Sequence, residues 1–117
     1  MNTCTEIEQE IVAKGLTAPR ITPQSIEDNI KRQVFFTAAD GIKGSSNPNG
    51  IPYEEHRILT LCVLTLKNGF TVVGKSACAS PEKFDAELGR QIARQDAVNK
   101  IWPLEGYRLR SELAAAK

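Results

Sequence analysis

A thiol and an imidazole six residues apart, Cys62 and His56, are the first pair in this sequence that could do chemistry. A cysteine beside a histidine base is the arrangement of thiol nucleophiles. Cys62, however, lies inside the apolar run ILTLCVLTL at 58–66, where a thiol is buried and unreactive. We therefore predict that Cys62 is a core residue and that the protein is not an enzyme.

Metal and cofactor sites are not predicted. The three cysteines have no CxxC spacing, and the chain has a single histidine, His56. Carboxylates near the histidine could contribute to a metal site, but no spacing supports one, and a solvated loop explains them better. The chain contains no glycine-rich phosphate loop. The residues considered for this metal site are Asp40, Glu54, Glu55 and His56.

A basic stripe on a predicted helix is a candidate phosphate site. Arg90 and Arg94 are four residues apart and share a helical face with Lys83. Two arginines on one face could hold a phosphate by charge-assisted hydrogen bonds. Glu87 lies on the same side, and an ion-pair network on an ordinary surface is the favoured alternative.

Neutral amides and aromatic residues complete the candidate binding set. Gln91, Gln95 and Asn99 recur every four residues among apolar neighbours and form an exposed face, a helix–helix seam or, least favoured, a ligand contact. Aromatic rings beside an arginine could clamp a base or a partner, although core packing is favoured for each. The predicted ligand or partner residues are Arg90, Arg94, Lys83, Phe36, Gln91, Gln95 and Tyr107.

Two short helices are predicted to precede a first strand. Thr3 and Glu6 have capping-box spacing, and Gly15 is a natural helix stop. A threonine followed by proline starts a second helix, which we expect to span about 22–32. The β-rich segment QVFFT at 33–37 follows as a strand.

A β-hairpin is the strongest structural prediction. The runs at 58–66 and 70–78 flank Asn-Gly, the preferred centre of a two-residue type I′ turn. That turn pairs Leu64 with Val73 and keeps the cysteines of the two strands apart, so no disulfide is expected between them. Both hairpin faces are apolar, so we expect helices, another sheet or a second subunit to cover both.

The remainder of the chain is predicted to be helical. Ser80-Pro81 starts a helix that we expect to end near residue 101, because the residue before Pro103 avoids helical angles. A short last helix at 104–113 follows, and residues 114–117 form a frayed tail. Together these elements predict one α+β domain over 1–117, with an antiparallel hairpin or small sheet packed with three to four helices, including a long C-terminal helix. Residues 41–57 are predicted to be a long surface loop.

Composition narrows the possible partners. Fifteen basic and fourteen acidic residues give a net charge of +1, so nucleic acid is an unfavoured partner. The N-terminus does not resemble a signal peptide, and no run approaches the length of a membrane span. We therefore expect a cytoplasmic protein that does not act at a membrane.

Several segments together resemble one family of tailed-phage proteins. The segments APRIT (18–22), FFTAADG (35–41), NGFTVVGKSAC (68–78), ASPEKFDAELGRQIAR (79–94) and IWPLEGYRL (101–109) are similar to small proteins grouped after gene products of enterobacterial podoviruses. The likeness covers most of the chain from about residue 16, without the segment at 42–57.

The resemblance implies a phage accessory protein that acts in the host cytoplasm. Accessory proteins of this size often counter host defence, and by that analogy the expected function is to neutralise a host defence protein by binding it. One alternative is an oligomeric sponge that sequesters a signalling cyclic nucleotide. A second alternative is a small nucleic-acid-binding or regulatory protein. Two apolar sheet faces also make a homo-oligomer a reasonable expectation.

Overall fold

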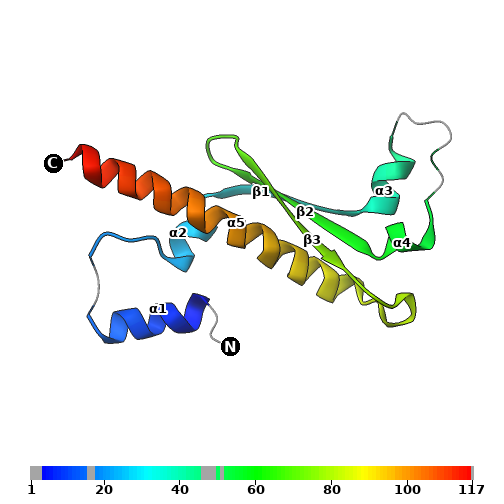
Figure 1. The fold of residues 1–117 in the computed structure, drawn as a ribbon, viewed down its shortest axis with the longest axis horizontal. Coiled ribbons are helices and arrows are strands. Elements are labelled where there is room, and N and C mark those ends of the chain that lie inside the picture. The colour runs from blue at the N-terminus through cyan, green and yellow to red at the C-terminus, as the bar shows by residue number, and fades with distance from the viewer. Residues whose placement is uncertain (1–3, 16–17, 46–49, 51, 117) are drawn as a thin grey trace.

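The computed structural model describes residues 4–15, 18–45, 50 and 52–116. Within them, three antiparallel strands in the order β1-β2-β3 form one sheet. A 30-residue helix, α5, crosses one face of that sheet, and shorter helices lie at its two ends (Figure 1). The elements are α1 (Cys4–Ala13), α2 (Pro23–Asp28), β1 (Ile30–Thr37), α3 (Ala38–Lys43), α4 (Glu54–Arg57), β2 (Leu59–Leu66), β3 (Thr71–Ala77), the 3₁₀ turn η1 (Pro81–Lys83) and α5 (Ala86–Ala115).

The core lies between the sheet and α5, which confirms the predicted α+β class with a long C-terminal helix. Alternate residues of β2 are buried, as the two-residue period of a strand requires. Cys62 and Leu64 are fully buried there, and Ala93, Ala97 and Ile101 meet them from α5. Small alanines on the helix allow it to lie close to the strands.

The turn of the hairpin has three residues, so the predicted register was wrong by one residue. Leu64 pairs with Val72, and Val63 pairs with Val73. Gly69 has a φ of 90°, whereas no described residue other than glycine has a positive φ. A type I′ turn requires positive φ at both central residues, so this loop is of the three-residue kind that ends in a left-handed glycine. The correction moves Val72 into the core and Val73 to the opposite face.

The second helix is shorter, and the first strand longer, than predicted. The Thr22 and Ser25 side chains form a capping box at the start of α2, but the helix ends at Asp28. Asn29 then accepts a backbone hydrogen bond from Lys67 at 3.0 Å, and Ile30 pairs with Leu66. Pairing with β2 therefore replaces the predicted last part of the helix, and β1 begins at residue 30.

The segment predicted as a loop at 41–57 contains helical turns at both ends. Thr37 caps α3, and the Asp40 carboxylate accepts the Thr37 backbone N–H at 3.0 Å. At the other end, α4 begins after Tyr53, whose backbone N–H donates to His56 Nδ1 at 3.0 Å. Local side-chain caps, which the sequence reading overlooked here, stabilise these short helices.

A single helix, α5, replaces the two C-terminal helices that were predicted. It begins after Asp85, whose carboxylate accepts the Leu88 N–H at 3.1 Å, and it passes through Pro103 without ending. It also includes Ala114 and Ala115 of the predicted tail. At the chain start, Gly15 follows α1 with a φ of 71°, and the predicted cap Thr3 lies outside the described residues.

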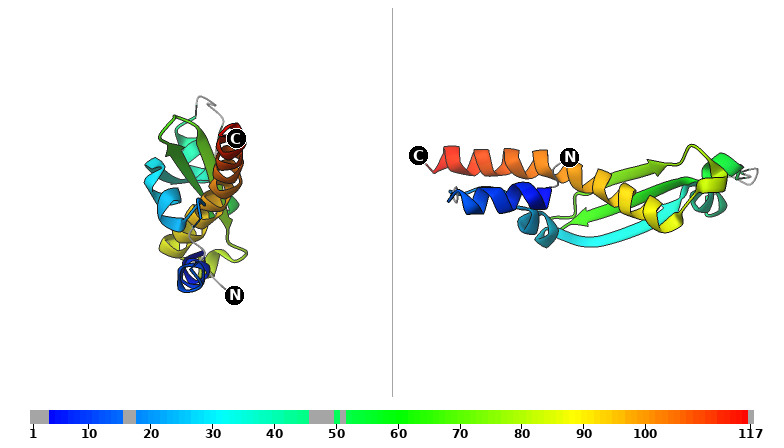
Figure 2. Two further views of the ribbon diagram at one scale, coloured as in Figure 1. Left: turned by 90° about the vertical axis from the view of Figure 1, so that its left-hand side faces the viewer. Right: turned by 90° about the horizontal axis from the view of Figure 1, so that it is seen from below.

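The molecule is thin and elongated for its length. Its extents are 57 × 31 × 17 Å, and its radius of gyration is 17.9 Å. A compact domain of this length has a radius of about 13 Å. Figure 2 shows the reason: the second half of α5 extends beyond the sheet, and helix covers the sheet mainly on one face. Among the described residues, therefore, the predicted cover is present on one face of the hairpin and not on the other.

Candidate functional site

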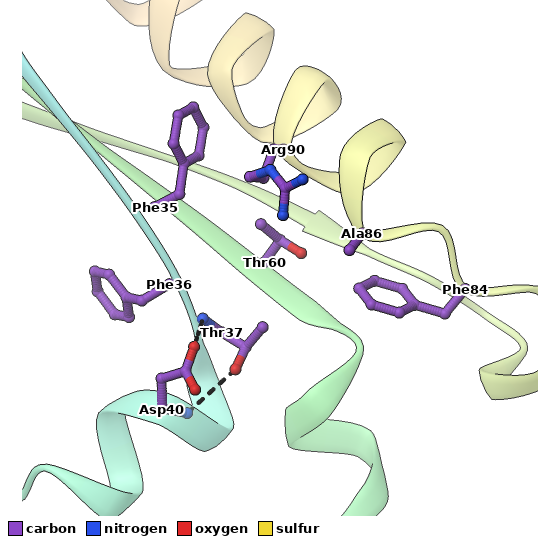
Figure 3. A pocket seen from close by; sticks show the side chains of 8 residues that line it. All are labelled: Phe35, Phe36, Thr37, Asp40, Thr60, Phe84, Ala86 and Arg90. Atoms are coloured by element: carbon purple, nitrogen blue, oxygen red, sulfur yellow. Dashed lines mark hydrogen bonds between the residues drawn. The ribbon is translucent and has the colours of Figure 1, made fainter.

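A pocket lies where the end of β1, the start of β2 and the first turns of α5 meet (Figure 3). Its volume is about 120 Å³. Strand alternation points Phe35 and Phe36 to opposite faces of β1, as predicted, and both line the pocket. The residues that line it are Phe35, Phe36, Thr37, Asp40, Thr60, Phe84, Ala86 and Arg90.

Thr60 lines the pocket, and its unpaired hydroxyl is buried against Gly89 of α5. The residue is 3% exposed, and its Oγ1 has no hydrogen-bond partner among the described residues. A buried polar group without a partner costs about 1–3 kcal/mol. Gly89 of α5 leaves room for it, because a Cβ at that position would lie 2.9 Å from Thr60 Oγ1.

Arg90 and Asp40 bring opposite charges to the same pocket. Arg90 extends from α5 toward Thr60 (Figure 3), and its Nη2 donates to the Glu87 carboxylate at 2.7 Å. Because a guanidinium has five N–H donors, others stay available. Hydrogen bonds from Thr37 lower the pKa of the Asp40 carboxyl, so that group is ionised at neutral pH. The pocket thus offers both donors and acceptors.

A second feature is the sheet face that points away from α5. Directly paired residues form three rows across the strands, and the middle row consists of valines: Val34, Val63 and Val73. We call this the valine row. Val34 is 53% exposed and Val73 is 44% exposed. The flanking rows are Arg32, Thr65 and Thr71 on one side, and Phe36, Leu61 and Lys75 on the other.

The charges beside the valine row are all basic. Arg32 lies in one flanking row on β1, and Lys75 lies in the other on β3, so they occupy diagonally opposite corners. The three rows contain no acidic residue. This face is therefore an apolar strip with a positive corner at each end.

Arg94, a predicted ligand residue, is instead bound to neighbouring elements. Its guanidinium donates to both Glu27 carboxylate oxygens at 3.0 and 2.7 Å, and its Nε donates to Gln33 at 2.9 Å. These contacts connect α5 to α2 and β1. Arg94 is not among the residues that line the pocket.

This ion pair predicts an acid-sensitive contribution to stability. The hydrogen bonds from Arg94 lower the pKa of Glu27. The contribution is therefore present above the ordinary carboxyl pKa of about 4.3 and is lost as the pH falls through the lower folded-state value. We expect Glu27→Gln to reduce the free energy of unfolding at pH 7 by less than about 1 kcal/mol, since the pair is partly exposed. Urea unfolding at pH 7 and pH 3 measures this difference.

A matched control is Glu55→Gln, which removes an exposed carboxylate on α4. It should leave the stability at pH 7 unchanged. A Glu27→Gln protein that lost the same stability at pH 3 as at pH 7 would show that charge pairing with Arg94 is not the cause.

The other predicted site residues lie apart from the pocket. Lys83 belongs to η1 and lines a separate depression with Cys78. Gln91 donates to Glu87 at 3.4 Å on an exposed surface, and Gln95 donates to Asn99 at 2.8 Å. Tyr107 is 79% exposed on the second half of α5. Of the seven predicted residues, the pocket brings together Arg90 and Phe36.

The cysteines have the surroundings of structural thiols. Cys62 is fully buried, and burial raises the pKa of its thiol, which disfavours the reactive thiolate. Cys62 and Cys78 are not bonded to each other, as predicted. Among the described residues, no group of three or more histidine, cysteine, aspartate and glutamate side chains is placed to hold a metal ion.

Sequence reasoning missed Thr60 and Phe84 as pocket residues. Thr60 stands in an apolar strand, and Phe84 follows a proline turn, so neither has a motif that indicates a site. One signal was available: Thr60 is polar, although it occupies a position of β2 whose neighbours two residues away are buried.

Comparison with known proteins places the chain among phage proteins. The family model described as "Phage protein (N4 Gp49/phage Sf6 gene 66) family" matches residues 21–113, which include every residue of the pocket and of the valine row. No curated protein and no solved structure matches the chain significantly. Among the described residues, every helix is too short or too polar to cross a membrane.

Proposed function

Since the chain belongs to the phage protein family of N4 Gp49 and Sf6 gene 66, we propose that it is a non-catalytic accessory protein that neutralises a host defence protein by binding it. The proposed binding surface is the valine row with its basic corners. The observation that supports this proposal is an apolar sheet face that no element among the described residues covers.

The exposed valines favour a macromolecular partner. An apolar sheet face in a folded domain is normally covered, because leaving apolar side chains in water forgoes about 25 cal/mol for each Å². Val34 and Val73 lie on either side of Val63 in direct cross-strand register, so the strip is continuous across the sheet. Exposed apolar strips of this kind are typical of protein–protein interaction sites.

Charge favours a different protein over a second copy of this chain. The face carries Arg32 and Lys75 and no carboxylate, so a copy placed on it would supply no acidic group from the same face. Like charges across an interface suppress association, whereas opposite charges steer it. The partner that fits has an apolar surface flanked by acidic side chains.

The experiment begins with a photo-crosslinking amino acid at Val34 or Val73 during infection of the host. We expect one host protein to be crosslinked from both sites and not from Tyr107, an exposed control on α5. That protein is then purified and its dissociation constant measured. Val73→Asp should weaken binding at least tenfold, because it places a charge in the apolar strip. Arg32→Gln should reduce the salt dependence of association.

Two results would overturn this proposal. In the first, Val73→Asp remains folded by circular dichroism and binds the purified protein as tightly as the unchanged chain. In the second, analytical ultracentrifugation shows a dimer that Val73→Asp dissociates, which would make the face a contact between copies of this chain.

A further inference from the structure

We propose that β1 pairs edge to edge with β1 of a second copy of this chain, so that the protein forms a dimer with one continuous sheet. The observation behind this inference is a strand edge whose backbone N–H and C=O groups have no partner among the described residues. The contact uses the edge of the sheet and not its open face, so this inference does not depend on the proposed host partner.

Hydrogen bonding within the sheet shows which backbone groups of β1 point outward. The Leu66 N–H donates to the Phe70 carbonyl at 2.8 Å, so the even-numbered residues of β2 bond to β3. Backbone groups alternate in direction along a strand, and the odd-numbered residues of β2 therefore bond to β1. Val63 pairs with Val34, so the even-numbered residues of β1 bond to β2 and the odd-numbered ones face away from the sheet.

Side chains of α5 close the opposite edge of the sheet. On β3, the outward-facing Lys75 N–H donates to the Asp96 carboxylate at 2.9 Å, and the outward-facing Val73 carbonyl accepts from Lys100. Free groups of this kind are what an unprotected strand offers to another chain. The edge of β3 is thus protected against pairing with a further strand.

The edge of β1 has no such protection over its middle. β1 forms the other margin of the sheet, with α2 at one end and α3 at the other (Figure 2). Among the described residues, the backbone groups of Gln33 and Phe35 that face outward have no hydrogen-bond partner. The Thr37 N–H is bonded to Asp40, and a bulge interrupts the strand after Ile30. Gln33 and Phe35 therefore remain available to another strand.

These two residues fix the register of a symmetric dimer. An antiparallel arrangement in which Gln33 pairs with Phe35 of the partner subunit places the two-fold axis at Val34, and each such pair exchanges two backbone hydrogen bonds. Val34 then lies opposite the partner's Val34, with about 4.5 Å between the Cα atoms. Because both copies use the same edge and the β3 edges are closed, assembly stops at the dimer.

The side chains in this register suit a second copy. Arg32 lies opposite Phe36 of the partner subunit, where a guanidinium can stack on an aromatic ring, and no like charges lie directly opposite each other. Val34 is 53% exposed in the single chain and gains an apolar neighbour in the dimer. The valine rows of the two copies join into one longer strip, which stays open to the partner proposed above.

The first test is a disulfide trap at the two-fold axis, Val34→Cys in the full chain. A Cα separation of about 4.5 Å lies within the range that a disulfide spans. We expect mild oxidation to convert most of this variant to a covalent dimer on a non-reducing gel. Val73→Cys, in the same row on β3, should remain monomeric on that gel. The unchanged chain should do the same, which controls for the native cysteines.

Analytical ultracentrifugation measures the dimer without a covalent link. We expect a monomer–dimer equilibrium for the unchanged chain. Val34→Lys should raise the dissociation constant at least tenfold, because it places two like charges opposite each other at the axis. Val73→Lys is the matched control and should leave the constant unchanged. Circular dichroism checks that both variants are folded.

Three results would disprove edge pairing. They are a chain that stays monomeric at every concentration, a dimer that folded Val34→Lys leaves as tight as before, and a covalent dimer from Val73→Cys but not from Val34→Cys. A β1 edge that pairs only with a strand of a host protein would give the first of these. The proposal of a host partner can fail separately, because Val73→Asp should weaken partner binding and leave this dimer intact.

Discussion

Replacing Gly74 with alanine is expected to reduce the free energy of unfolding by about 3 kcal/mol, the upper end of the usual cost of overpacking. A Cβ at this position would lie 2.0 Å from the Ala93 carbonyl oxygen and 2.3 Å from the Ala97 nitrogen. Both are main-chain atoms of α5, so no side-chain rotation can relieve the clash. The helix would have to move away from β3, and the core residues beneath it would lose contacts. Urea unfolding followed by circular dichroism measures the change.

Gly106→Ala is the matched control for this substitution. Gly106 lies within α5 itself, and a Cβ there meets no atom within 4 Å. Alanine is a better helix former than glycine by about 1 kcal/mol, so Gly106→Ala should stabilise the protein slightly. If Gly74→Ala left stability within about 0.5 kcal/mol of the unchanged chain, the close approach of β3 to α5 would be disproved.

The kinds of element were predictable where the sequence pattern is strong and local. The β-type apolar run at 58–66 predicted β2, and Thr22-Pro23 predicted the start of α2. The end of α2 was not predictable from the same signals, because it depends on the pairing of Ile30 with Leu66, a residue 36 positions away. Helix and strand propensities depend on nearby residues only, so they cannot predict pairing over such a distance.

In the hairpin, a difference of one residue in the turn changes which side chains lie on each face of the sheet. Asn-Gly is compatible with a two-residue turn or with a three-residue loop that ends in glycine. The structure has the latter, with Gly69 in the left-handed region and the Phe70 N–H bonded to Asn68 Oδ1 at 2.9 Å. Since side chains alternate along a strand, the one-residue difference exchanged Val72 and Val73 between the faces. The valine row could therefore not be predicted.

The candidate site was predictable only in part. Arg90 and Phe36 were chosen for their chemistry, and both line the pocket. Arg94 was chosen on the same grounds, but its partners Glu27 and Gln33 come from elements more than 60 residues earlier. Helical spacing identifies residues that share a face, whereas the tertiary fold determines which of them are bound by other elements.

Replacing Pro103 with alanine is expected to raise the free energy of unfolding by about 2 kcal/mol, because proline inside a helix removes a hydrogen bond and clashes with the preceding turn. The sequence predicted that the helix ends here, because the residue before a proline avoids helical angles. The helix nevertheless continues, since contacts on both sides of the proline hold it in place. Ile101 is fully buried before it, and Glu105 after it accepts a hydrogen bond from Asn29 Nδ2 at 2.6 Å.

Thermal unfolding tests this explanation, with Leu104→Ala as the control at the adjacent, 41% exposed position. Pro103→Ala should raise the unfolding midpoint by roughly 8 °C, at about 4 °C for each kcal/mol, and Leu104→Ala should change it little. A lower midpoint for Pro103→Ala would have a different meaning. It would show that the proline sets the direction in which α5 leaves the sheet, and that a regular helix moves Glu105 away from Asn29. The contact between Glu105 and Asn29 would then require the proline, and would not merely form in spite of it.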